Sequence, residues 1–199
     1  YVEFSDKPLD VLLDKFVSVY KKTNNMPLVL TYTNKDVNSI NSTVRDYLVK
    51  NNKLGDGYVF ETHKGNKAFC VGDKIICLEN NNSFGVKNGT AGIIDNIDKN
   101  IIRLKADGKV FNIDVNVYKK FDYGYAVTIH KAQGMTVDDS VFYVNGRSLS
   151  SNLVYVALSR HKQNINIVVN KAKINDICLL SNKVDVNIKK HYGNAFSQN

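Results

Sequence analysis

Two signatures of nucleoside triphosphate binding are missing from this 199-residue sequence. No stretch matches G-x-x-x-x-G-K-[ST], because Gly108-Lys109 is followed by Val110 and has the setting of a hairpin turn. No apolar run ends in an Asp-Glu pair that would hold Mg²⁺. Since the backbone amides of the first motif are what cradle a β/γ-phosphate, we do not expect the chain alone to hydrolyse a nucleoside triphosphate.

Cysteine and long apolar runs are also scarce. The three cysteines form no C-x-x-C pair and stand among apolar residues, which predicts reduced thiols in a cytoplasmic protein and no zinc or other metal site. No apolar run approaches the length of a membrane span, so no membrane contact is expected. No signal peptide precedes Tyr1, and an opening partway into an α/β pattern suggests an excised piece.

Acidic residues are outnumbered by basic ones, 19 to 27, which gives the chain a net charge of +8. Such a surplus favours a polyanionic partner, with nucleic acid as the first candidate. A soluble protein that is merely basic remains the alternative on charge alone. The hydrophobic content of 43% is ordinary for a globular protein and supplies an ample core.

The apolar pattern predicts an α/β domain at both ends of the chain. Residues 8–22 repeat apolar positions at helical spacing, with Ser5 or Asp6 as the expected cap and Pro8 in the first turn. An apolar strand at residues 28–32 follows, and Asn34 is the expected cap of a second helix. Beyond residue 119 we predict three strands, at 125–129, 141–144 and 165–169. We also predict a helix from Ser150 or Ser151 to Ser159.

Short β-type runs separate these two α/β stretches. Five of them occur, at residues 58–61, 74–78, 91–97, 101–104 and 110–115. Asn88-Gly89 and Asp107-Gly108 predict tight hairpins, because these pairs tolerate positive φ. We therefore expect a small β-barrel of residues 55–118, inserted into an α/β domain formed by residues 1–54 and 119–199.

Ala126–Gly134 is the first candidate site, because an apolar run ends there in a polar cluster. Ligands bind open α/β sheets at the carboxyl ends of the strands. Thr128, His130 and Lys131 are good donors to phosphate oxygens, and Gln133-Gly134 permits a sharp turn and close approach to a ligand. A turn that merely satisfies its own backbone groups is the alternative.

Arg160 ends the second cluster, Leu153–Arg160. Leu153, Val156 and Arg160 share one helix face, so the arginine is expected on the packed side and directed at the same strand edge. A guanidinium there fits a phosphate. The alternative is a salt bridge to an internal carboxylate such as Asp138 or Asp139.

Weaker signals come from two other turns. Thr31, Thr33 and Asn34 end the earlier strand in polar groups, although helix capping alone explains Asn34. Lys87 and Asn88 stand beside an aromatic in the Phe84–Thr90 turn, where a plain hairpin is the alternative.

Taken in order, these segments resemble the second motor domain of superfamily 1 helicases, in the RecD-like branch and especially in the TraA-type conjugative relaxase-helicases. Val127–Gly134 resembles motif V, Tyr155–His161 resembles motif VI, and Leu30–Val37 with Asn41 resembles the stretch around motif IV. Residues 72–76 and 85–89 resemble the SH3-like insert of that branch. The resemblance implies a RecA-like parallel-sheet domain of the P-loop NTPase type without the P-loop, interrupted by an SH3-like β-barrel.

The resemblance also implies roles for single residues. Arg160 would contact the γ-phosphate of ATP bound with magnesium, and Gln133 and Gly134 would lie along the nucleotide cleft. Single-stranded DNA would be contacted by Thr33, Asn34, Lys87, Asn88, Thr128, His130 and Lys131. The partners implied are the N-terminal motor and relaxase domains of a longer helicase, the first of which holds the nucleotide. Met135-Thr136 departs from the family, because many relatives place there an acidic residue that reaches the ribose.

Two functions of other classes stay open on the sequence alone. One is a non-catalytic nucleic-acid-binding module, such as the remnant of a decayed gene, which the missing P-loop favours. The other is an SH3-like protein-interaction adapter, for which the basic charge is incidental.

Overall fold

The computed structural model describes residues 2–132, 135, 137–146 and 161–173, which belong to two compact units. The first unit consists of Tyr1–Val37 and Val127–Asn199, and the second of Asn38–Ala126. All of residues 55–118 lie in the second unit. That they form a separate inserted domain stays a prediction. No helix among the described residues is long and apolar enough to cross a membrane.

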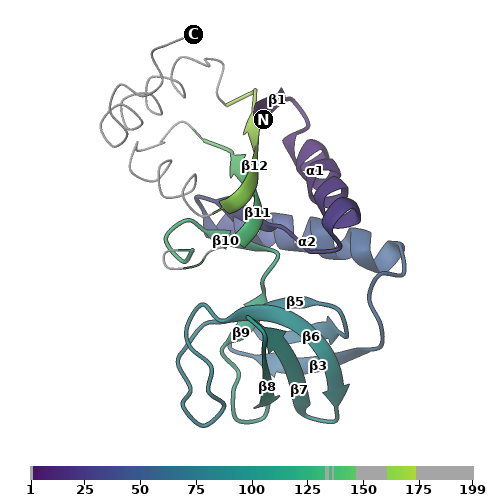
Figure 1. Cartoon of the computed structure of the whole chain (residues 1–199), viewed down its shortest axis with the longest axis vertical. Coiled ribbons are helices and arrows are strands. Elements are labelled where there is room, and N and C mark those ends of the chain that lie inside the picture. The colour runs from purple at the N-terminus through teal and green to yellow at the C-terminus, as the bar shows by residue number, and fades with distance from the viewer. Residues whose placement is uncertain (1, 133–134, 136, 147–160, 174–199) are drawn as a thin grey trace. The chain divides into compact units, whose positions relative to one another are not determined.

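A five-stranded parallel sheet is the centre of the first unit (Figure 1). In spatial order its strands are β1 (Val2–Ser5), β12 (His161–Asn170), β11 (Val137–Val144), β2 (Leu28–Thr31) and β10 (Ala126–Thr128). β12 pairs in parallel with β1 and β11, and β11 pairs in parallel with β2. All four residues of β2 are buried, as expected for a continuous apolar strand inside a parallel sheet. The α/β prediction is confirmed, although β1 was not predicted.

Helix α1 (Pro8–Thr23) lies beside this sheet and contacts β1, β11 and β12. Its apolar face buries Leu12 and Phe16 completely, as the helical spacing predicts. Pro8 occupies the first turn, also as predicted. The predicted cap is wrong: the N-cap residue is Lys7, whose side chain makes no capping bond, and the Ser5 hydroxyl accepts from the Lys7 N–H instead (3.0 Å).

Two antiparallel sheets make up most of the second unit. One contains β8 (Lys109–Asp114), β7 (Ile101–Ala106), β6 (Ala91–Asp98), β5 (Lys74–Cys77) and β9 (Phe121–Tyr123), and the other contains β3 (Gly57–Thr62) and β4 (Gly65–Cys70). All five predicted runs are strands, whereas β4 and β9 were not predicted. Asp107 and Gly108 have φ of 49° and 71° and join β7 to β8 in the predicted hairpin. Asn88-Gly89 forms a tight turn, in which the Thr90 N–H donates to the Lys87 carbonyl (2.9 Å) and Gly89 has a φ of 91°. This turn lies within the longer connection of residues 78–90, so the prediction that it joins two strands directly as a hairpin is wrong.

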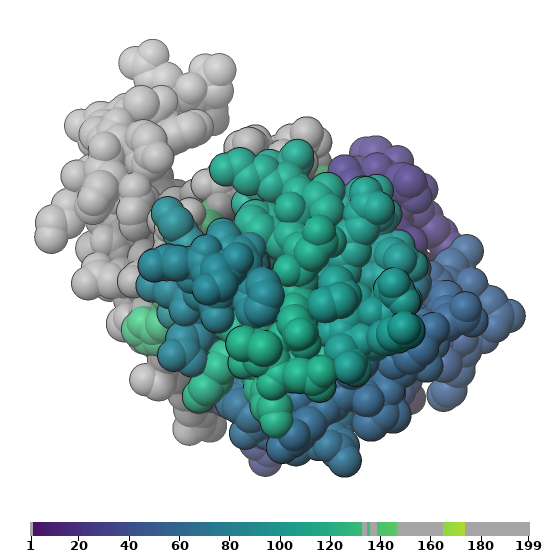
Figure 2. Space-filling model, turned by 90° about the horizontal axis from the view of Figure 1, so that it is seen from below, coloured from purple at the N-terminus to yellow at the C-terminus, as the bar shows by residue number. Residues whose placement is uncertain are grey.

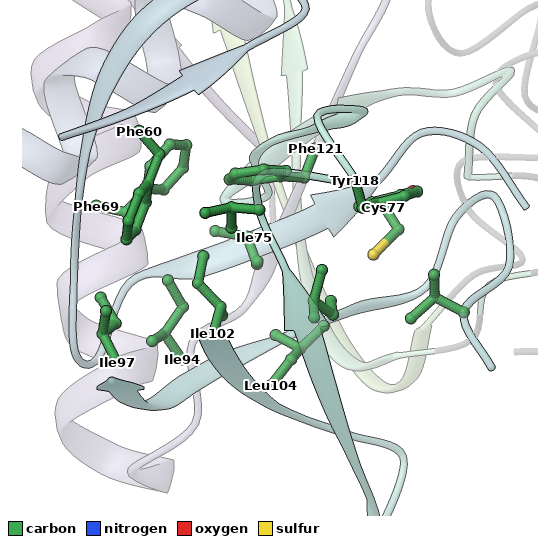
Figure 3. Packing of buried hydrophobic residues seen from close by; sticks show 13 residues of the cluster. Phe60, Phe69, Ile75, Cys77, Ile94, Ile97, Ile102, Leu104, Tyr118 and Phe121 are labelled. Carbon is green, nitrogen blue, oxygen red and sulfur yellow. The ribbon is translucent and has the colours of Figure 1, made fainter. Parts of the chain in front are cut away.

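An aromatic and aliphatic core holds this unit together, and Figure 3 shows its side chains directed at one another. The Phe69 ring packs 5.0 Å from the rings of both Phe121 and Tyr123. Cys77 lies in this core, where burial raises the pKa of its thiol to about 11. Figure 2 shows one face of this unit, in blue to teal.

Helix α2 (Asn34–Lys50) joins this unit through two polar side chains one turn apart. The Asn41 side chain donates to the carbonyl of Tyr123 (3.3 Å) and accepts from the N–H of Ala126 (2.8 Å). It thus makes the two backbone hydrogen bonds that a neighbouring strand would otherwise make. Arg45 donates through Nε to both carboxylate oxygens of Asp73 (3.2 Å each). The residues that lead into β10 are thereby fixed to α2.

Asp73 is the centre of a buried polar network. Its side chain is 0% exposed and also accepts from the Cys70 N–H (2.7 Å) and the Tyr125 hydroxyl. Arg45 donates in addition to the Cys70 sulfur (3.2 Å). The expectation that every cysteine has apolar company is therefore wrong for Cys70, while Cys178 lies outside the described residues.

Candidate functional site

The carboxyl ends of β2 and β10 meet at one edge of the parallel sheet. The N–H of Ile129, just beyond β10, donates to the carbonyl of Thr31, the last residue of β2 (2.9 Å). The turns that follow the two strands are therefore neighbours. They bring together five of the predicted nucleic-acid contacts, which are Thr33, Asn34, Thr128, His130 and Lys131. We call this the carboxyl edge.

Thr128 uses only part of its hydrogen-bonding capacity inside the turn. Its hydroxyl accepts from the Lys131 N–H (3.3 Å), and its carbonyl accepts from the Ala132 N–H (3.0 Å). The alternative, in which the turn only satisfies its own backbone hydrogen-bonding groups, is thus partly correct. A hydroxyl has one proton and two lone pairs. Among the described residues nothing accepts the proton of the Thr128 hydroxyl, so this hydroxyl can still donate to a phosphate, although the residue as a whole is only 7% exposed. His130 and Lys131 are exposed beside it.

Thr33 is the N-cap of α2, so the prediction that Asn34 caps this helix is wrong. The Thr33 hydroxyl accepts from the Asp36 N–H (3.0 Å) and donates its only proton to Asp36 Oδ2 (2.7 Å). This is an N-cap hydrogen bond, to which the Asp36 carboxylate adds a second bond with the same hydroxyl. The Thr33 hydroxyl consequently has no proton for a phosphate. The exposed side-chain amide of Asn34 keeps both of its protons for an external acceptor, because it has no hydrogen-bond partner among the described residues.

The capping assignment predicts unequal effects of two neighbouring substitutions. Thr33→Ala should lower the free energy of unfolding by about 1 kcal/mol, because the first turn of α2 loses its cap. Asn34→Ala, the matched control, should change it by no more than about 0.5 kcal/mol. Urea titrations followed by circular dichroism measure both. A larger loss in the free energy of unfolding for Asn34→Ala than for Thr33→Ala would favour Asn34 as the N-cap of α2.

A row of hydrogen bonds continues along the carboxyl edge from β2 to β12. Asp36 is 8% exposed, and its Oδ1 accepts from the side-chain amide of Asn145, just beyond β11 (2.7 Å). Asn145 in turn accepts from the side-chain amide of Asn170, the last residue of β12 (2.7 Å). None of these three was predicted to be part of the site. The Thr-x-x-Asp spacing gives a signal for Asp36, but nothing in the sequence indicates the two asparagines.

The amino ends of two strands mark the opposite edge of this sheet. Val137, the first residue of β11, is the register partner of His161, the first residue of β12. The nucleotide-site candidates Gln133, Gly134 and Arg160 precede these strands and lie outside the described residues. The direction predicted for Arg160 therefore stays a prediction.

Lys87 and Asn88 belong to the second unit. Their backbone N–H groups donate to Thr90 Oγ1 (3.0 Å) and Asn80 Oδ1 (2.8 Å), which fixes the loop from within. Both side chains are exposed. The described residues include no group of three or more His, Cys, Asp or Glu that could hold a metal ion.

Comparison with known proteins identifies relatives of this chain. A family model of the viral superfamily 1 RNA helicase core domain matches residues 58–169. The conjugal transfer protein TraA of Agrobacterium fabrum is 35% identical over 144 residues, which are 70% of this chain and 13% of that protein. The RecBCD subunit RecD of Buchnera aphidicola is 26% identical over 170 residues, which are 77% of this chain and 28% of the relative. This chain therefore spans only a small part of the length of these curated relatives.

A solved structure shows the same fold. The Pif1 helicase from Bacteroides, in complex with ADP-AlF3 and single-stranded DNA, superposes with a TM-score of 0.56 at 20% identity. The match covers 94% of this chain and 50% of that one. The parallel sheet with an antiparallel β subdomain is thus the architecture of a helicase motor domain.

Proposed function

We propose that this chain is the C-terminal motor part of an ATP-dependent DNA helicase or translocase. The chain belongs to the superfamily 1 helicase core family and is related to TraA conjugal transfer proteins and RecD. In this proposal the carboxyl edge binds single-stranded DNA. The amino edge completes an ATP site whose other half belongs to a first motor domain. A relaxase domain would be a further part of the same TraA-like protein.

The DNA-binding half of the proposal depends on one observation above all. The Ile129–Thr31 hydrogen bond joins the turns after β2 and β10, so donors from both turns face the same edge. Thr128 offers a hydroxyl proton, Lys131 an exposed ammonium group and Asn34 an exposed amide. Phosphate oxygens accept from all three kinds of donor. Thr33 is better described as the residue that fixes the α2 end of this surface.

The nucleotide half is supported by the pairing of Val137 with His161. Because β11 and β12 begin side by side, the segments that precede them approach the same edge of the sheet. Arg160 immediately precedes β12, and Gln133 and Gly134 come shortly before β11. Arg160 would place its planar guanidinium on the γ-phosphate of ATP, and Gly134 would permit close backbone approach. Magnesium and most contacts to the phosphates would come from the first motor domain.

The connection between the two sites is the segment from Thr128 to Val137. It leaves β10 at the carboxyl edge and enters β11 at the amino edge. A shift of the nucleotide-site residues when the two motor domains close would therefore act on the DNA-contacting turn through fewer than ten residues of chain. Lys87 and Asn88 would add DNA contacts from the second unit.

Salt-dependent binding of a fluorescent oligothymidylate to the 199-residue chain tests the DNA half. For single strands the logarithm of the binding constant falls with the logarithm of salt concentration by about 0.7 per phosphate neutralised. Lys131→Gln should make this slope shallower by about 0.7, and Thr128→Val should weaken binding several-fold at an unchanged slope. Lys21→Gln, an exposed lysine in the last turn of α1, is the control. Absent or salt-independent binding would contradict the proposal and favour a protein-interaction adapter.

A further inference from the structure

We propose that the path of the nucleic-acid backbone continues along the whole carboxyl edge to the end of β12, where Lys171 is a further phosphate contact. This inference rests on the proposed DNA binding at the turns after β2 and β10. It adds a contact on the far side of the sheet, beyond any residue that the helicase motifs of this sequence single out.

Positive charge is concentrated at this edge. The residues that directly follow the five parallel strands are 6–7, 32–36 (which include the first residues of α2), 129–132, 145–146 and 171–173, and they contain only two acidic residues, Asp6 and Asp36. They contain five lysines, which are Lys7, Lys35, Lys131, Lys171 and Lys173. This excess of three charges is a large share of the +8 of the entire chain. A polyanion is attracted to such an edge along its length.

Three of these lysines are available to an external anion. Lys35, Lys131 and Lys171 are exposed, and none has a carboxylate within ion-pair distance among the described residues. Asp36, the acid nearest to the middle of the edge, is almost buried. Its two oxygens accept from Thr33 and Asn145, so its charge is partly satisfied inside the protein.

The backbone beneath Lys171 is held in place by the neighbouring strands. The Lys171 N–H donates to the carbonyl of Ser5 at the end of β1 (3.0 Å). Asn170, the preceding residue, donates to Asn145 and accepts from the Ala172 N–H (3.1 Å). Lys171 therefore follows directly on the hydrogen-bonded row that runs from β12 to the N-terminus of α2, and its position does not depend on a long loop.

The length of this edge suits a short stretch of single strand. Three strand spacings separate β12 from β10, which amounts to roughly 14 Å. A few nucleotides cover that length, so one strand can contact Lys131 and Lys171 at the same time. Of the polar groups between them, Asn34 and Asn145 are neutral, and the Asp36 carboxylate is only 8% exposed and already accepts from Thr33 and Asn145.

The test measures the salt dependence of oligothymidylate binding to the 199-residue chain with Lys171→Gln, beside Lys131→Gln and the control Lys21→Gln. We expect Lys171→Gln to weaken binding several-fold at low salt and to make the slope shallower by about 0.7, as for one lost phosphate contact. Because Lys171 is exposed, the fold is not at risk, which circular dichroism verifies.

The outcomes separate this inference from the proposed function. If Lys131→Gln makes the slope shallower and Lys171→Gln leaves it unchanged, the extended path is overturned and DNA binding at the β10 turn stands. If the three variants bind alike, with the same slope as the unaltered chain, the proposed DNA surface fails together with its extension. If Lys21→Gln has an effect equal to that of Lys171→Gln, the attraction is a general effect of net charge and the inference is likewise overturned.

Discussion

Replacing Arg160 by alanine in a protein in which a first motor domain accompanies this chain should lower the rate of ATP turnover by roughly 10³–10⁵-fold. The physical reason is that a guanidinium on the γ-phosphate stabilises charge that develops only in the transition state. Affinity for single-stranded DNA should change little, because the proposed DNA contacts follow the opposite ends of the strands. Steady-state ATPase rates at saturating DNA, with DNA affinity measured in parallel, give both quantities.

Two further variants make this prediction specific. Arg160→Lys keeps the positive charge but loses the planar donor fork, so turnover should remain strongly reduced. Arg103→Ala removes a half-exposed arginine of β7 that pairs with Asp95, and turnover should be unchanged. Undiminished turnover in Arg160→Ala would remove this residue from the nucleotide site. A parallel loss of DNA affinity would instead indicate a structural role.

The strands that the sequence predicted correctly are those whose signal is local. Leu28–Thr31 has three apolar residues before Thr31 and is buried throughout, and Asp107-Gly108 forms its hairpin because both residues adopt positive φ. β4 and β9 were missed for a physical reason. β4 begins Gly-Asn-Lys and β9 has only three residues, so neither shows a clear alternation, and each is a strand because its partner supplies the hydrogen bonds.

The sequence predicted the residue types of the candidate site better than it predicted their hydrogen bonds and positions. The polar ends of β2 and β10 were found because buried strands that end in donors are a local pattern. Thr33 donates its hydroxyl proton to Asp36, whereas the Thr128 hydroxyl only accepts within its turn. No rule of sequence spacing predicts this difference between the two threonines. The row from Asp36 through Asn145 to Asn170 joins residues more than 130 positions apart in the sequence, since only the strand order makes them neighbours.

The direction assigned to Arg160 from the sequence stays a prediction for a related reason. Helical periodicity places Arg160 on a face, but it does not say at which end of the sheet the helix ends. The parallel register of β11 and β12 supplies this, because a strand that begins at the amino edge must be preceded by a residue near that edge. We therefore propose separate chemistry at the two edges of the sheet.

Asp73→Ala should be among the most destabilising single substitutions in the second unit, with a loss of about 3–5 kcal/mol in the free energy of unfolding. Asp73 is 0% exposed and accepts from Arg45, Cys70 and Tyr125. Its removal leaves the Arg45 guanidinium, whose side chain is only 15% exposed, without a counter-charge. It also leaves the Cys70 N–H and the Tyr125 hydroxyl without an acceptor.

Urea titration followed by circular dichroism measures this loss, and amide hydrogen exchange at Cys70 reports it locally. Asp95→Ala is the matched control, because Asp95 pairs with Lys105 and Arg103 at the surface and its loss should barely move the urea midpoint. The double variant Asp73→Ala with Arg45→Leu should recover part of the stability, since no unpaired charge then stays buried. If Asp73→Ala and Asp95→Ala shift the midpoint equally, the network is not what fixes α2 to the residues that lead into β10. The DNA-contacting turn would then lack the rigid support on which its proposed role depends.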